Sequence, residues 1–298
     1  MSIMEGNFAS TYMLPIVIGI IMINLGFSLD LRDFKEIIKN PKQIVIGLIS
    51  QMILLPLIAF GIANISGLSP ELKVGIMIIA ACPGGAVSNL ITYWLKGSVP
   101  LCISLTTLNS FLILITMPAI VYFSLYFFTG DAGIIDTPVT SMIIKIFFMI
   151  LIPVGIGMYV RYKNKPGAQK LESYMKYLTT LLLAVVYSFV IFEKKDGEMT
   201  KLSEYMEIAP WVFAMNVLGM TAGFLMGRWS GLNIKKQITL SVEVGIQNSA
   251  LAITIAGSEV FLGNHEMALP AVVYGAFTFF NAVIFGMIIK KINPRKNI

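Results

Sequence analysis

The sequence has little charge and few of the residues that build metal or disulfide sites. Of its 298 residues, 13% are Asp, Glu, Lys or Arg and 56% are hydrophobic, against about 25% charged in soluble domains. Together with a mean hydropathy of +0.81, this balance excludes an ordinary soluble domain and predicts an integral membrane protein. The chain has one histidine, His265, and two cysteines, Cys82 and Cys102, in apolar surroundings. These cysteines predict no disulfide framework.

Apolar runs bounded by charged residues or by Gly and Pro predict nine membrane-spanning helices of roughly 20 residues each. They cover about 10–29, 44–66, 74–96, 99–127, 138–160, 174–192, 208–229, 236–258 and 268–290. Such spans leave only short loops, so we expect one all-α polytopic domain over residues 1–298. The first basic residue, Arg32, follows the first run, whereas a signal peptide carries positive charge before its apolar run. We therefore expect that run to remain as a helix. In the seventh run Gly219, Gly223 and Gly227 recur every four residues, which lets membrane helices approach closely.

The Lys and Arg residues are divided unevenly between the two sides of the membrane. Of the 22, 17 follow odd-numbered spans, four follow even-numbered spans, and Lys145 lies inside a span. Short loops rich in Lys and Arg stay cytoplasmic. The split predicts a multi-pass protein of the inner (plasma) membrane with its N-terminus outside and its C-terminus in the cytoplasm. The basic residues do not cluster with aromatic residues, so membrane lipid, and not nucleic acid, is the expected surrounding. No obligate protein partner is indicated.

One acidic residue differs from the other 15 of the chain. Those 15 lie in loops or at the ends of spans, but Glu243 lies well inside the eighth span. Its neighbourhood, Leu240-Ser-Val-Glu-Val-Gly-Ile-Gln-Asn-Ser-Ala250, is too polar for a helix that faces lipid. An ionisable side chain in the membrane is costly and indicates a functional site. Glu243 is therefore predicted to handle ions or protons.

The third span is also interrupted, at Ala81-Cys-Pro-Gly-Gly-Ala-Val-Ser-Asn-Leu90. Pro83 lacks a backbone donor, and Gly84 and Gly85 allow dihedral angles outside the helical range. We expect the helix to break here. Irregular backbone at membrane depth is tolerated where it faces protein or a watery cavity, so Ser88 and Asn89 are predicted to line such a cavity.

The two interruptions lie in spans that cross the membrane in opposite directions. Paired, interrupted helices at corresponding positions indicate a secondary transporter with an inverted repeat and a binding site at the midplane. The N-termini of the half-helices favour an anion, and carbonyl and side-chain oxygens favour a hard cation. The pattern predicts a cation-coupled anion carrier.

These motifs resemble those of one transporter family. Cys82-Pro-Gly-Gly85 followed by Ser88-Asn89, and Glu243-Val-Gly-Ile-Gln-Asn248, are similar to the two crossing helices of the bile acid:sodium symporter family. The similarity extends over the whole chain and includes Leu25-Gly-Phe-Ser-Leu-Asp-Leu-Arg-Asp-Phe34, Gln51, Tyr93, Lys96-Gly97 and Asn281.

The resemblance implies two sodium sites that share one carboxylate. The first would comprise Ser88, Asn89, Thr106 and Glu243, with a possible place for Cys102; the second would comprise Gln51, Glu243, Gln247 and the backbone carbonyls of Val244 and Ile246. It further implies a substrate cavity lined by Asn248, Asn281 and position 86, here Ala86. Family members divide into a panel, here about 10–29 and 138–192, and a core, here about 44–127 and 208–290.

The chain departs from the family pattern at three places. Many bacterial members have ten helices, and this chain is expected to lack the first. Cys102 stands where members often carry a serine, and sulfur is a poor ligand for Na⁺. Ala86 replaces a common threonine and removes one hydrogen-bonding group from the substrate cavity.

Other functions remain open. A proton-coupled carrier would use Glu243 as the titrating group. A channel or a receptor is a further alternative, but neither function would explain why two spans carry paired interruptions. An intramembrane enzyme is disfavoured, because the chain lacks a second intramembrane carboxylate and a His-Glu-x-x-His motif. The family carries bile acids, small carboxylates such as pantoate or pyruvate, and sulfated or sulfonated anions, so the resemblance leaves the substrate open within these classes.

Overall fold

The computed structural model describes residues 12–29, 41–130, 139–192, 194–195, 198–199 and 201–292. Apart from loops and turns, this part of the chain is helical except for two-residue strands, β1 (Lys194–Lys195) and β2 (Glu198–Met199), which pair antiparallel. Several residues used in the sequence interpretation lie outside the described ranges: the ends of two predicted spans, at 10–11 and 138, and the basic residues Arg32, Lys35, Lys39, Arg295 and Lys296.

Within the described ranges, each of the nine predicted spans coincides with one helix or with consecutive helical segments. The elements are α2 (Leu14–Ser28), α4 (Pro41–Ile49), the π-helix η2 (Ser50–Leu54), α5 (Leu55–Ile65), α6 (Pro70–Ala81), α7 (Ala86–Trp94), α8 (Val99–Thr129), α9 (Val139–Ile146), the π-helix η4 (Phe147–Leu151), α10 (Ile152–Lys163), α11 (Lys165–Phe192), α12 (Leu202–Trp229), α13 (Ile234–Gly245), α14 (Ser249–Gly257) and α15 (His265–Ile292).

Some helices extend beyond the apolar runs that predicted them. Helix α11 begins at Lys165 and not at 174, and α12 begins at Leu202 and not at 208. Hydropathy marks only the part of a helix that lies in hydrocarbon, whereas backbone hydrogen bonding continues into water. At the start of α12 the carboxylate of Glu204 accepts from the backbone N–H of Lys201 at 3.4 Å.

Six stretches of the described chain are long and apolar enough to cross a membrane. They are Pro41–Ile65, Val99–Thr129, Thr140–Lys163, Leu202–Trp229, Ile234–Gly257 and His265–Ile289. In five of them 33–39% of the most apolar window is buried inside the protein, whereas in Ile234–Gly257 the buried share is 94%. The segment that carries Glu243 is therefore central in an all-α polytopic membrane protein, and the other five face outward over most of their surface.

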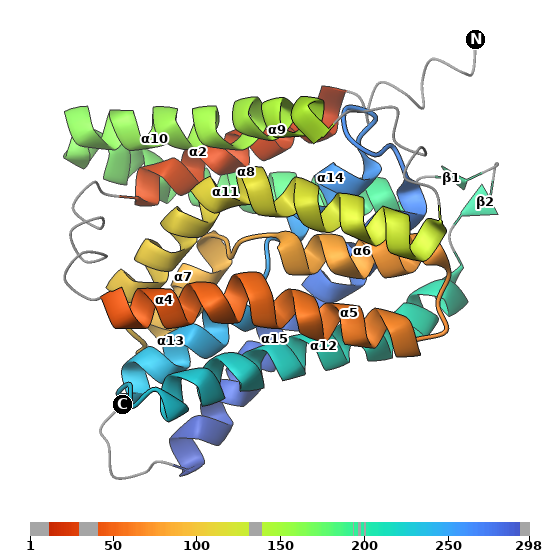
Figure 1. Cartoon of the computed structure of the whole chain (residues 1–298). Helices are drawn as coiled ribbons and strands as arrows, with labels where there is room; N and C mark the ends of the chain where they lie inside the picture. Colours follow the sequence, from red (N-terminus) through yellow and green to blue (C-terminus); the bar gives the residue numbers. More distant parts are fainter. Residues whose placement is uncertain are drawn as a thin grey trace.

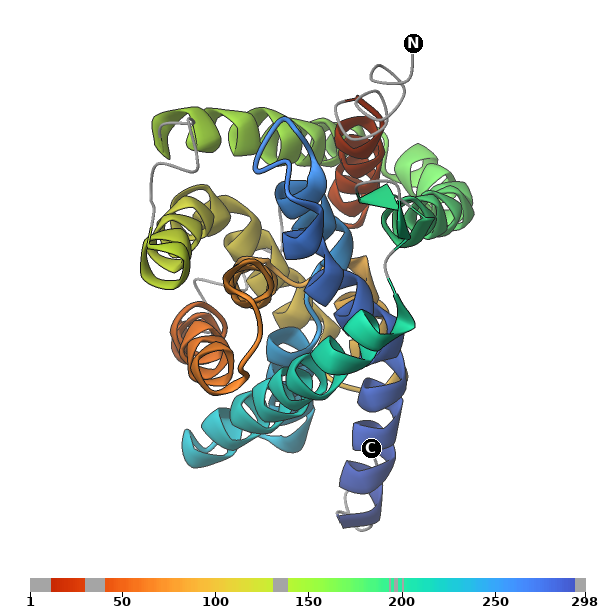
Figure 2. The same cartoon turned by 90° about the vertical axis from the view of Figure 1, so that its right-hand side faces the viewer.

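Both predicted helix breaks are present, and they touch. Helix α6 ends at Ala81 and α7 starts at Ala86; α13 ends at Gly245 and α14 starts at Ser249. The backbone N–H of Asn248 donates to the carbonyl of Pro83 at 3.0 Å, which joins one break to the other. Helix α6 packs against α14, and α7 packs against α13. Figures 1 and 2 show α6 inside the bundle, and Figure 1 shows α13 beside α12 at the lower left.

Two pairs of helices approach each other closely at glycine residues. Helices α2, α10 and α11 pack together, and Figure 1 shows α2, α9 and α10 along one side of the bundle. A Cβ added at Gly26 of α2 would lie 2.3 Å from the carbonyl of Val154 in α10, so these backbones touch. In the second pair α12 packs along α13, where a Cβ at Gly223 would lie 2.4 Å from the carbonyl of Leu240. The close approach predicted from the glycine spacing of α12 is confirmed.

Candidate functional site

Glu243 lies near the end of α13, and its carboxylate is enclosed by side chains from two other helices. It is 1% exposed. Its Oε1 accepts from the hydroxyl of Thr106 at 2.8 Å, and its Oε2 accepts from the hydroxyl of Ser88 at 3.0 Å and the thiol of Cys102 at 3.1 Å. Ser88 belongs to α7, and the other two donors lie one turn apart on α8. Three neutral donors thus converge on one buried carboxylate.

The break in the third span makes room for this carboxylate. A Cβ added at Gly84 would lie 2.7 Å from Oε1 of Glu243, so only glycine fits there without displacement. The thiol of Cys102 also accepts from the hydroxyl of Thr92 at 3.4 Å and lies 3.8 Å from that of Ser88. Asn89, the next residue on α7, has a buried Oδ1 without a hydrogen-bond partner. Of the residues assigned to the first sodium site, Ser88, Thr106 and Glu243 therefore lie within hydrogen-bonding distance, and Cys102 lies beside them.

The residues assigned to the second sodium site come from the π-helix η2, from the last turn of α13 and from the break after it. The amide Nε2 of Gln51 donates to Oε1 of Gln247 at 2.7 Å and to the carbonyl of Cys82 at 3.1 Å, while its Oε1 is buried without a partner. The carbonyl of Val244 accepts from Nε2 of Gln247 at 2.8 Å. Ile246 has extended backbone, with φ −115° and ψ 105°. The π-helix aims Gln51 into the core, and such single turns are frequent at functional sites.

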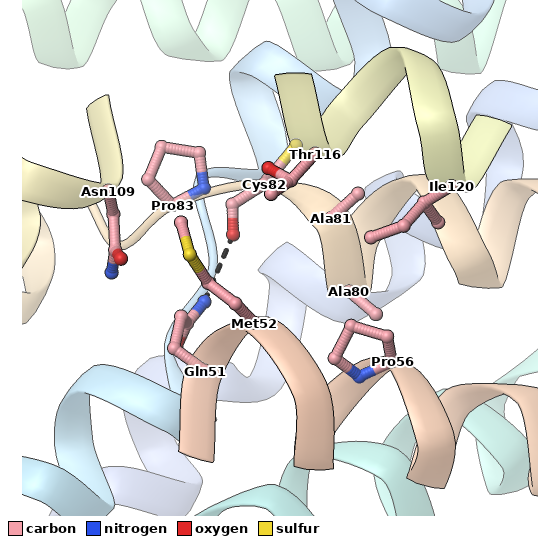
Figure 3. A pocket seen from close by; sticks show the side chains of 10 residues that line it. All are labelled: Gln51, Met52, Pro56, Ala80, Ala81, Cys82, Pro83, Asn109, Thr116 and Ile120. Carbon is pink, nitrogen blue, oxygen red and sulfur yellow. Dashed lines mark hydrogen bonds between the residues drawn. The ribbon is translucent and has the colours of Figure 1, made fainter. Parts of the chain in front are cut away.

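A small pocket beside Gln51 contains a residue that the sequence interpretation missed. Figure 3 shows Gln51, Cys82, Pro83 and Asn109 around it, and it has room for about one water-sized group. Asn109 is 1% exposed, and neither its Oδ1 nor its Nδ2 has a hydrogen-bond partner. It lies on α8 three residues after Thr106, on the same face of that helix. The spacing of three residues from Thr106 is the sequence signal that could have identified Asn109 as a residue of this region. A survey of charged residues does not include Asn109, because its side chain is neutral.

The residues assigned to the substrate cavity have separate surroundings. The side chain of Asn248 caps α14 by accepting from the N–H of Leu251 at 3.1 Å. A Cβ at Gly85 would lie 3.6 Å from its Nδ2. The Nδ2 of Asn281, on α15, donates to Oδ1 of Asn216 at 2.9 Å. Ala86 begins α7, and its side chain lies outside the described part of the structure.

Helix termini add to the electrostatics of this region. The N-termini of α7 and α14 both begin at the touching breaks and present partial positive charge there. The C-termini of α6 and α13 end at the same place and present carbonyl oxygens. Oxygen ligands around a carboxylate suit a hard cation, and the two N-termini suit an anion. The geometry can hold both close together.

Comparisons with known proteins agree with this geometry. The model of the sodium bile acid symporter family matches residues 15–202. The chain is 29% identical over 251 residues to the uncharacterized sodium-dependent transporter YocS of Bacillus subtilis, covering 84% of this chain and 75% of the relative. It is 31% identical over 252 residues to the human ileal sodium/bile acid cotransporter, covering 81% of this chain and 68% of the relative. A human sodium-dependent organic anion transporter is 28% identical over 271 residues, covering 90% and 70%. Because the family model matches more than half of the chain, this protein belongs to the sodium bile acid symporter family.

Proposed function

We propose that the chain is a sodium-coupled symporter that carries an organic anion across the membrane by alternating access. The observation that carries this proposal is the carboxylate of Glu243, buried at the touching helix breaks and held by donors that are all neutral. A carboxylate in the membrane interior is costly unless a positive charge compensates it. Hydroxyl and thiol donors satisfy its oxygens but leave its charge. A bound cation supplies the missing charge.

Two sodium ions share Glu243 in this proposal. The first is held by Ser88, Asn89, Thr106 and Glu243, with Cys102 at the edge of the site. The second is held by Gln51, Gln247, Glu243 and the carbonyls of Val244 and Ile246. The unpartnered oxygens of Asn89 and Gln51 support this assignment, because a buried oxygen without a donor is free to bind a cation. A negative charge between the ions offsets part of their mutual repulsion.

The substrate is an organic anion of the bile acid or small carboxylate class. Its negative group lies at the N-termini of α7 and α14, which supply a favourable dipole. Asn248 and Asn281 border this cavity, and Ala86 leaves it with one hydrogen-bonding group fewer. The names of the relatives, which include bile acid and organic anion transporters, support the class of substrate.

The cycle requires one helix group to move against the other. Helices α2, α9, α10 and α11 form the panel, and α4 to α8 with α12 to α15 form the core that carries both breaks. An inverted repeat can present two similar openings to opposite faces of the membrane. Sodium occupancy on the outer side then favours loading of the anion there.

Uptake into proteoliposomes tests the proposal. Taurocholate, pyruvate and pantoate serve as labelled probes under a sodium gradient or a pH gradient. We expect uptake of at least one probe to follow the sodium gradient. Uptake that follows only the pH gradient would establish the proton-coupled carrier instead.

The variant Glu243→Gln should abolish sodium-driven uptake, because it removes the charge that both ions share but keeps size and polarity. Gln51→Ala should weaken uptake less, since one neutral ligand is lost. Glu259→Gln is the matched control, because Glu259 is exposed near the end of α14. Wild-type uptake in the Glu243 variant would refute the proposal.

A further inference from the structure

The carbonyl of Gly245 is held by two side chains from helices on either side of it. A helix C-terminus leaves its last carbonyls without partners in the helix. At the end of α13 the Gly245 carbonyl accepts from the hydroxyl of Tyr274 at 2.5 Å and from Nδ2 of Asn216 at 2.5 Å. Tyr274 lies on α15 and Asn216 on α12, and both are 0% exposed. We call this pair of side chains the carbonyl clamp.

The chemistry of the groups in the clamp fixes which of them donates and which accepts in each hydrogen bond. The carbonyl has two lone pairs, and both are used. The second N–H of Asn216 points to the Tyr274 oxygen at 3.3 Å, so that hydroxyl accepts from Asn216 and donates to Gly245. The Oδ1 of Asn216 accepts from Asn281 at 2.9 Å. An uninterrupted hydrogen-bonded chain therefore leads from the backbone at Gly245 to the half-buried side chain of Asn281.

The backbone at Gly245 has little freedom to move by itself. A Cβ at Gly245 would lie 2.0 Å from Cγ of Met220, so the chain rests directly on α12. The same peptide unit is held at its other end, because the N–H of Ile246 donates to the carbonyl of Val242 at 2.9 Å. This unit lies between Val244 and Ile246, whose carbonyls are assigned to the second sodium site. It adjoins the two peptide units that carry those carbonyls, so its orientation limits where they point.

We propose that Asn216 and Tyr274 are positioning residues that aim the carbonyls of the second sodium site and couple that site to Asn281 on the substrate side. The inference rests on the proposed function. A substrate that displaces the Asn281 amide shifts Asn216, which in turn shifts the Gly245 peptide. By linkage, sodium that orders this peptide also orders Asn281 for the anion. The clamp thus transmits ion binding to the substrate cavity through hydrogen bonds that are buried at Gly245 and part-buried at Asn281.

Sodium binding alone tests the inference, so that no substrate needs to be known. Detergent-purified protein is melted in increasing NaCl at constant total salt with choline chloride, which gives the sodium concentration for half-maximal stabilisation. Tyr274→Phe removes one hydroxyl at nearly constant volume, and we expect it to raise this concentration 5- to 10-fold. Thr254→Val is the matched control, because the buried Thr254 hydroxyl bonds only a carbonyl of its own helix.

A second variant tests the connection to the substrate side. The amide of Asn281 donates to Asn216, which is not one of the assigned sodium ligands, and Asn281→Ala should raise the half-maximal concentration 2- to 5-fold. The double variant with Tyr274→Phe should show less than the product of the two effects, because both act through Asn216. Because Asn281 is only half-buried, we expect Asn281→Ala to fold. This variant therefore tests the inference even if Tyr274→Phe does not fold.

The outcomes separate the inference from the proposed function. A wild-type protein that NaCl does not stabilise over choline chloride would overturn the proposed function, and the inference with it. Wild-type stabilisation by sodium with an unchanged half-maximal concentration in both variants would overturn the inference alone. A variant that melts at lower temperature without sodium but has wild-type sodium dependence would also overturn the inference. It would show that the clamp stabilises the fold and does not affect sodium binding.

Discussion

Glu243 is held by a thiol as well as by two hydroxyl groups. Cys102 is 0% exposed, and its sulfur lies 3.1 Å from the carboxylate. An S–H group is a weak donor and its sulfur is a weak acceptor, whereas the hydroxyls of Ser88 and Thr106 are strong in both roles. The proposed first sodium site therefore has one soft group among hard ones. At the scale of single residues, the sulfur of Cys102 is therefore the group whose substitution gives the clearest test.

We predict that Cys102→Ser strengthens sodium binding. Serine is nearly isosteric and places an oxygen beside the carboxylate, so the sodium concentration for half-maximal stabilisation should fall by a factor of ~3–10, or about 0.7–1.4 kcal/mol. Sodium titration of both proteins by thermal melting measures the change. An unchanged or weaker sodium affinity would mean that Cys102 only packs the site and that other groups complete it.

At the scale of elements, the function depends on two helices that stop and restart. The break between α6 and α7 brings the Pro83 carbonyl to the N–H of Asn248, and it brings Gly84 against Glu243. Both contacts require backbone to approach closely. A side chain at the break would therefore act on the carboxylate across the interface between the two spans.

We predict that Gly84→Ala displaces Glu243 and weakens sodium binding by about 10-fold or more. The added Cβ would lie 2.7 Å from Oε1 of Glu243, and such overpacking costs about 1–3 kcal/mol. The control is Gly61→Ala on α5, where an added Cβ meets nothing within 4 Å. Melting in NaCl against choline chloride measures both variants. Equal sodium dependence in the two would show that the carboxylate relaxes without loss.

At the scale of the whole molecule, the uneven division of positive charge predicts the orientation. The N-terminus should face outside and the C-terminus the cytoplasm, because 17 of the 22 basic residues follow odd-numbered spans. Alkaline phosphatase or a fluorescent protein, fused to one end of the chain at a time, reports directly on which side of the membrane that end lies. Both ends on the same side would exclude nine spans.

Alternating access predicts that sodium changes the exposure of the cavity. Single cysteines at Asn248 and Asn281 should react with a membrane-impermeant maleimide at rates that change when sodium replaces choline. The native Cys82 and Cys102 are buried and add little background. A cysteine at the exposed Glu259 should react equally in both salts. Unchanged rates at both cavity positions would indicate a fixed pocket.

Local composition by itself determined which parts of this chain form helices in a membrane and where two of them break. Apolar runs predict spans because hydrocarbon excludes polar side chains. Pro83 and Gly84 predict a break because proline lacks a backbone N–H and glycine allows dihedral angles outside the helical range. The position of Glu243 in a span likewise marks a site without any knowledge of its neighbours. The helix ends at Lys165 and Leu202 were missed, because hydropathy does not register helix that continues into water.

Only the tertiary structure decided which polar side chains meet. Helical periodicity places Cys102 and Thr106 on one face of α8, but it does not say that Glu243, far along the chain, lies opposite them. The family resemblance supplied such pairings for the assigned sites and was silent on Asn216 and Tyr274. The residues next to an uncharged polar residue in an apolar helix do not indicate which distant side chain it will contact. The partner follows from close packing between helices, here of α12 and α15 around the end of α13, which depends on shape over the whole bundle.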